Sequence, residues 1–155
     1  MKHPLLLIFL ISFLYLPESK AQSSNELNSG WKCAPVDSIK FDGYKISKSG
    51  FNINNWMSAT IPGTVLTTLL NNKKVPDPFF GMNNEQIPDI YKTGRDYYTY
   101  WFVKDFKEQV GPDDQVYLDF RGVNYSCDIY LNGKSSTKRP RWGCFSAIVT
   151  TLPHS

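Results

Sequence analysis

Few residues in this 155-residue chain have the types and spacing that catalysis requires. Its two histidines, His3 and His154, lie near opposite ends, so a Ser/His/Asp triad has no base within the body of the chain. Nucleophile-elbow, phosphate-loop and zinc-protease motifs are absent from the sequence. Two carboxylates about 5–9 Å apart would suffice for glycoside hydrolysis, but no spacing singles out a pair. The residues therefore predict no catalytic site, no metal site and no cofactor.

The segment Val75–Asp89 (VPDPFFGMNNEQIPD) is the best candidate for ligand contacts. Its three prolines and one glycine disfavour regular structure, and ordered loops of this length are commonly functional. The polar side chains that could contact a substrate are Asp77, Asn83, Asn84 and Asp89. The interpretation that we favour, because aromatic side chains in loops usually pack, is a structural collar held in place by Phe79 and Phe80.

The elements that must position this loop are mostly strands. Asp96–Phe106 (DYYTYWFVKDF) is aromatic and β-branched on both faces, which predicts a strand buried between layers, with Trp101 and Phe102 in the core. Clustered aromatics also suit stacking on a sugar, and Tyr98, Tyr100 and Trp101 would form such a platform if they were exposed.

Gln115–Lys134 predicts two further strands and a turn. Apolar residues alternate with polar ones, which places Leu118, Phe120, Ile129 and Leu131 in the core. Asn132-Gly133 is a strong signal for a type I′ hairpin. Short, irregular strands are expected within Trp31–Ile46 and Trp56–Ile61. One short helix is expected over 64–71, with Thr64 as its cap.

Three cysteines leave one unpaired if a disulfide forms. Cys127 lies on the apolar face of its predicted strand, which favours a buried, inert thiol. A Cys33–Cys127 disulfide is the alternative, and the spacing of Cys33, Cys127 and Cys144 does not match a zinc site.

The net charge of +3 does not indicate nucleic-acid binding. Basic residues in excess lie at the two ends of the chain, whereas the 22–134 region is nearly balanced. A nucleic-acid surface would need basic residues gathered on the folded body.

Met1–Ala21 has the anatomy of a secretory signal: a basic Lys2, an apolar run Leu5–Leu16, and small residues before a cleavage site near Ala21. The apolar run is too short to span a bilayer, so we expect export to the periplasm or the exterior without a stable membrane span. Residues 22–30 would form a flexible lead-in.

Several segments together resemble the N-terminal domain of glycoside hydrolase family 2, in the branch of β-mannosidases, exo-β-glucosaminidases and mannosylglycoprotein endo-β-mannosidases. They are Ile61–Leu66 (IPGTVL), Pro76–Asn83 (PDPFFGMN), Ile87–Asp89 (IPD), Tyr100–Phe102 (YWF), Phe120–Tyr125 (FRGVNY) and Asp128–Gly133 (DIYLNG). The resemblance covers residues 31–134. It implies an all-β, galactose-binding-domain-like jelly-roll sandwich, which would be incomplete in this chain because fewer than eight strands are available.

The resemblance also implies a partner. In that family the sandwich packs against a TIM barrel that carries the catalytic glutamates and acts on carbohydrate, so residues 31–134 alone would be an inactive, substrate-proximal fragment. Residues 135–155 depart from the family pattern, and we hypothesise a shift of reading frame near Lys134–Ser135. Unpaired strand edges would then make the isolated chain prone to aggregate. The alternatives are an autonomous carbohydrate-binding module and a small secreted interaction domain.

Overall fold

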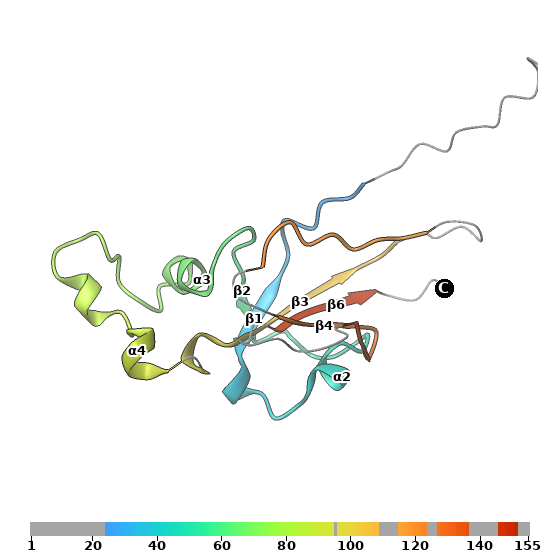
Figure 1. Cartoon of the computed structure of the whole chain (residues 1–155), viewed down its shortest axis with the longest axis horizontal. Coiled ribbons are helices and arrows are strands. Elements are labelled where there is room, and N and C mark those ends of the chain that lie inside the picture. Colours follow the sequence, from blue (N-terminus) through green and yellow to red (C-terminus); the bar gives the residue numbers. More distant parts are fainter. Residues whose placement is uncertain (1–23, 95, 109–114, 124–126, 137–145, 152–155) are drawn as a thin grey trace, which may run out of the picture.

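The computed structural model describes residues 24–94, 96–108, 115–123 and 127–136, and the backbone of 146–151. Strands dominate, and the helices are short (Figure 1). In chain order the elements are β1 (Lys32–Pro35), η1 (Val36–Ser38), α2 (Gly43–Ile46), β2 (Met57–Ser58), α3 (Val65–Asn71), η2 (Asn83–Gln86), α4 (Ile90–Thr93), η3 (Asp96–Tyr98), β3 (Tyr100–Phe106), β4 (Asp128–Leu131), β5 (Lys134–Ser135) and β6 (Ser146–Thr151).

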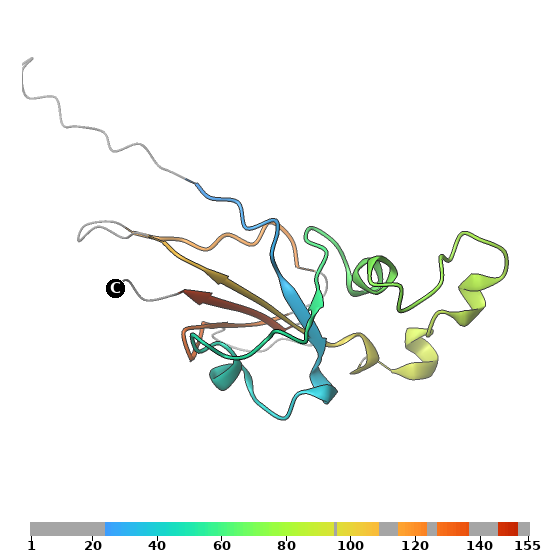
Figure 2. The same cartoon turned by 180° about the vertical axis from the view of Figure 1, so that it is seen from behind.

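The strands form one sheet in the order β2-β1-β3-β6-β4-β5. β1 pairs antiparallel with both β2 and β3, and β4 pairs antiparallel with β5. β6 lies between β3 and β4 and runs parallel to both, with Val103, Ile148 and Tyr130 in register across the three strands. The two halves of the sheet are therefore joined through β6 (Figures 1 and 2).

Each face of the sheet carries its own apolar cluster. On one face Val65 and Leu69 of α3 pack with Cys33 and Tyr100. On the other, Ile46 of α2 packs with Trp101 and Val103. Neighbouring residues of β3 thus belong to opposite clusters, as the alternation of side chains along a strand requires. The prediction that β3 is apolar on both faces because both are covered is confirmed.

Helix α3 begins where the sequence indicates. The Thr64 hydroxyl accepts a hydrogen bond from the backbone N–H of Thr67 at 3.1 Å, which satisfies one of the unpaired donors of the first turn. Buried Thr68 accepts from the backbone N–H of Thr60 at 3.0 Å and so attaches the helix to the preceding segment. The predicted helix over 64–71 is confirmed.

The predicted hairpin is also confirmed. Asn132 and Gly133 have φ of 50° and 77°, the positive values that a type I′ turn needs, and β4 and β5 pair on either side. The N–H of Gly133 donates to the hydroxyl of buried Ser47 at 3.0 Å. This bond fixes the hairpin against the end of α2.

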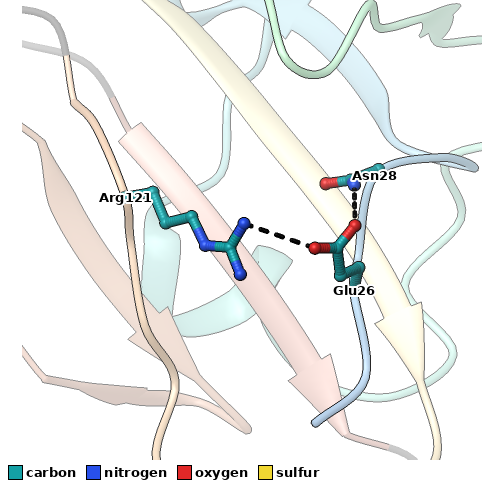
Figure 3. A network of polar contacts seen from close by, with 3 residues as sticks. All are labelled: Glu26, Asn28 and Arg121. Carbon is teal, nitrogen blue, oxygen red and sulfur yellow. Dashed lines mark hydrogen bonds and ion pairs between the residues drawn. The ribbon is translucent and has the colours of Figure 1, made fainter.

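The strand predicted over Gln115–Phe120 is wrong: these residues are irregular. Val116 and Tyr117 are 56% and 79% exposed, and Leu118 is 38% exposed, so Leu118 is not in the core. The reason is topological, because β6 holds the place beside both β3 and β4 where this segment would pair. Just after this segment, Nη1 of Arg121 lies 3.3 Å from Oε1 of Glu26, and the Glu26 carboxylate also accepts a hydrogen bond from the Asn28 side-chain amide at 2.6 Å (Figure 3).

The other predicted core residues divide by depth. Trp101 is buried, whereas Phe102, Phe120, Ile129 and Leu131 are half-buried. Asp96–Tyr98 forms a 3-10 turn rather than strand, so β3 begins four residues later than predicted. Within Trp31–Ile46 only β1 is strand, because Asp42 caps the short helix α2 by accepting from the N–H of Lys45 at 2.9 Å.

No helix within the described part of the chain is long and apolar enough to cross a membrane. The predicted signal segment, residues 1–21, lies outside the described residues, as does most of 135–155.

Candidate functional site

The loop predicted to contact ligand is organised by its own polar side chains. The Asp77 carboxylate accepts from the N–H of Phe79 at 2.9 Å, and the Asp77 carbonyl accepts from the Asn83 side-chain amide at 3.0 Å. The Asn83 side-chain oxygen accepts from Gln86 at 3.2 Å. Two of the four predicted contact residues therefore hold the backbone of the loop, and Asn84 lies exposed beside them.

The fourth predicted residue, Asp89, caps the N-terminus of helix α4. Its carboxylate accepts from the N–H of Tyr91 at 2.9 Å, and its carbonyl accepts from the Thr93 hydroxyl at 2.8 Å. The Tyr98 hydroxyl donates to the Pro88 carbonyl, which ties this end of the loop to η3. Burial raises the pKa of Tyr98, and the nearby Tyr97 and Asp89 raise it further. Asp77 and Asp89 thus act locally as turn and cap residues, and their contact with a substrate stays a prediction.

The large apolar side chains of this region are exposed to solvent. The exposed fractions are 96% for Phe79, 76% for Phe80, 66% for Met82, 44% for Ile90 and 95% for Tyr91. We call these five residues the apolar loop surface. Figure 1 shows that the segment carrying them extends well beyond the sheet and α3. The collar predicted from Phe79 and Phe80 is therefore wrong: within the described residues these rings are not packed.

Sequence reasoning did not identify Tyr91 as part of this surface. Its only signal is its position two residues after the capping Asp89, in a four-residue helix whose residues are all exposed. A pattern of residue types cannot show whether any other element packs against so short a helix, because that depends on residues far along the chain.

An open depression of about 690 Å³ lies between the end of α3 and the start of the loop. Its lining includes Leu70, Lys73, Lys74, Asp77 and Phe79. This lining holds two lysines and one acidic residue, whereas the acid and nucleophile roles in glycoside hydrolysis need two carboxyl groups. The depression has the chemistry of a contact surface and not of a hydrolytic centre.

The aromatic platform considered for sugar stacking is not available. Tyr100 and Trp101 are 4% and 7% exposed, because they belong to the clusters on the two opposite faces of the sheet. Tyr98 is half-buried and packs edge-on against Tyr97. A stacked sugar needs a free aromatic face, so this strand cannot supply one.

The thiols of Cys33 and Cys127 are free, so the disulfide considered between them is absent. Burial is the main cause that raises the pKa of Cys33 to about 11, and burial also raises that of Cys127. Both are poor nucleophiles near neutral pH. Within the described ranges, no group of three His, Cys, Asp or Glu side chains could hold a metal ion.

The comparison with protein families decides what this domain is. The family of glycosyl hydrolase 2 galactose-binding domain-like sequences matches residues 42–139, which include the loop, β3 and the hairpin. The chain belongs to this family. Its galactose-binding-like fold class and its relation to glycoside hydrolase family 2 are as the sequence motifs predicted.

Curated relatives agree with the family-2 assignment. A mannosylglycoprotein endo-beta-mannosidase from Lilium longiflorum is 48% identical over an alignment of 111 residues, and this match covers 69% of this chain and 12% of that protein. Exo-beta-D-glucosaminidases from Streptomyces avermitilis and Amycolatopsis orientalis are 30% and 32% identical, over 75% and 63% of the chain. The family-2 domain thus spans about a tenth of the length of these relatives. No solved structure matches the chain.

Proposed function

We propose that this family-2 domain is the N-terminal, non-catalytic part of an exported enzyme that hydrolyses β-mannosidic or β-glucosaminidic bonds. Its role is to carry the apolar loop surface against the catalytic part of that enzyme, near the rim of the substrate site. The observation that carries this proposal is the exposure of five large apolar side chains on one loop and its helix.

Exposed apolar surface on a folded domain marks an interaction site. Full burial of one phenylalanine contributes about 1.5–3 kcal/mol. Phe79 and Phe80 therefore offer a substantial driving force for docking, while the turn around Asp77 keeps the backbone of the loop in one shape. The partner that fits is the polypeptide that the relatives carry beyond the matched stretch.

The relatives supply the substrate class of the proposal. Their names specify beta-mannosidase and beta-D-glucosaminidase activities, and the matched stretch in this chain includes the whole loop. We assign no reacting group to this domain, and Asp77, Asn83, Asn84 and Asp89 are proposed as contacts at the rim.

A chimera tests the proposal directly. The matched stretch of the lily enzyme is replaced by that of this chain, and endo-mannosidase activity is measured. We expect activity to persist in the chimera and to fall at least tenfold when Phe79→Ser and Phe80→Ser are added, since about 1.4 kcal/mol of lost docking corresponds to tenfold.

The matched control is Val123→Ser, which changes an apolar side chain that is 43% exposed but lies outside the loop. It should leave the activity of the chimera unchanged. Equal activity of the control and the double phenylalanine variant would refute docking through the apolar loop surface.

Export is a separate proposal that rests on Met1–Ala21. The mass of the protein recovered from the medium or periplasm should correspond to a chain that begins near Gln22. Recovery only inside the cell, with residues 1–21 still attached, would contradict it.

A further inference from the structure

One strand position of the sheet lies between β3 and β4. β3 and β4 both run parallel to β6, so they run in the same direction as each other with one strand position between them. We call this position the β3–β4 slot. In the structure β6 fills this position. Residues 132–145 lie between β4 and β6 in the sequence.

A second segment has the direction and length for the same position. Residues 115–120 follow β3 after 107–114 and precede β4 after 121–127. A strand that turns back after β3 and turns again into β4 would run antiparallel to both, and such neighbours need only short connections. Like β6, the segment has six residues.

Residues 115–120 have the side-chain pattern of a strand inside a sheet, but they are not paired as a strand in the structure. Apolar and polar residues alternate, yet Val116, Tyr117 and Leu118 are 56%, 79% and 38% exposed. Insertion into the slot would bury one face of this segment and replace parallel pairing by antiparallel pairing, which is slightly more stable per residue.

The boundary of the family match also favours residues 115–120 as a strand between β3 and β4. The match covers residues 42–139 and therefore includes 115–120 but not β6. The part of this chain that matches the family thus contains β3, β4 and residues 115–120, but it does not contain β6.

We propose that Gln115–Phe120 and Ser146–Thr151 are alternative occupants of the β3–β4 slot, in opposite orientations. In the second arrangement 115–120 joins β3 to β4 in an antiparallel meander and β6 is released. The chain thereby exchanges one central strand for another while β1, β2 and the β4–β5 hairpin keep their pairing.

Hydrogen–deuterium exchange of the full chain, followed by mass spectrometry, tests the proposal. Val149→Pro removes a backbone donor from β6, which a central strand does not tolerate. We expect the amides of 115–120 to exchange at least about tenfold more slowly in this variant, while those of 146–151 lose protection. The matched control is Leu118→Pro, which disables the competing strand and should leave 146–151 protected.

A second variant keeps the test decisive if Val149→Pro fails to fold. Asp105 and Thr150 are in-register neighbours on β3 and β6, so Asp105→Cys with Thr150→Cys can lock β6 in the slot, in a background carrying Cys127→Ser and Cys144→Ser. Reduction of this disulfide should increase the protection of 115–120. Unchanged exchange of 115–120, either on reduction or in a folded Val149→Pro variant, would overturn the proposal.

Discussion

Cys33 belongs to the apolar cluster in which Val65 and Leu69 of α3 pack against the sheet, and its side chain has no exposed surface. Burial disfavours the thiolate, which raises the pKa from 9.0 to about 11 despite the nearby charge of Lys32. The unfolded chain therefore releases this proton at lower pH than the folded chain does. The contribution of the protonated thiol to the free energy of unfolding is fully present below pH 9, and it is lost as the pH rises from 9 to 11. The loss from this residue is up to about 3 kcal/mol.

Urea unfolding between pH 8 and 11 measures this effect. The pH dependence should weaken in Cys33→Ala, which has no thiol to titrate at that position. It should not vanish, because burial also raises the pKa values of Cys127, Tyr100 and Tyr130. An identical slope in the variant and the parent would exclude Cys33 as a contributor.

Gly43 is a second residue with a tightly packed environment, which leaves no space for a side chain. A Cβ atom at this position would lie 2.3 Å from the ring of Tyr130. That ring is held edge-on between Tyr44 and Trp101, at centroid distances of 5.2 and 6.2 Å, so it cannot move aside at low cost. We expect Gly43→Ala to lower the free energy of unfolding by about 1–3 kcal/mol.

Gly122→Ala is the matched control, since no atom of the described residues lies within 4 Å of the added Cβ. Denaturant titrations of both variants should separate them clearly. Equal stability of the two would mean that the Tyr130 ring yields to the new methyl group.

Among the secondary-structure elements, α3 depends on Thr64, the residue that caps its N-terminus. Seven residues are too few for a helix to be stable by propensity alone, so its cap and its packing must hold it. Removing the Thr64 hydroxyl leaves the N–H of Thr67 without its partner at 3.1 Å. We expect Thr64→Ala to cost about 1 kcal/mol of folding free energy and Thr64→Ser to cost much less.

Thermal unfolding of the Thr64→Ala and Thr64→Ser proteins checks this expectation. The serine variant controls for loss of the methyl group, because it keeps the capping oxygen. Were both variants equally destabilised, the contribution of Thr64 would lie in its packing and not in the cap.

At the scale of the whole molecule, the apolar loop surface should govern self-association. Phe79 and Phe80 bury little area within the described chain, so Phe79→Ser with Phe80→Ser should leave the free energy of unfolding within about 0.5 kcal/mol. The same change should reduce aggregation of the isolated chain, as followed by light scattering against concentration. Val65 is only 4% exposed, so Val65→Ser should instead lower the free energy of unfolding. A large loss of stability in the double variant would restore the collar interpretation.

Local patterns in the sequence were sufficient for the elements whose determinants are also local. The capped helix at 64–71 and the Asn132-Gly133 turn depend on residues within a few positions of one another, and both are present. The alternation within Tyr100–Phe106 likewise predicted a strand covered on both faces, because side-chain direction along a strand follows from its geometry. The family motifs, spread over a hundred residues, were enough to predict membership.

The tertiary structure alone decided where those elements pair and which apolar side chains are covered. Gln115–Phe120 has a sound strand pattern, but a strand exists only with a neighbour, and β6 occupies the position beside β3 and β4. Phe79 and Phe80 are apolar residues of the kind that core packing favours, yet they are 96% and 76% exposed, because no described part of the chain covers them. Alternation and capping are properties of a few adjacent residues, whereas pairing and burial are choices among distant partners, which no local pattern contains.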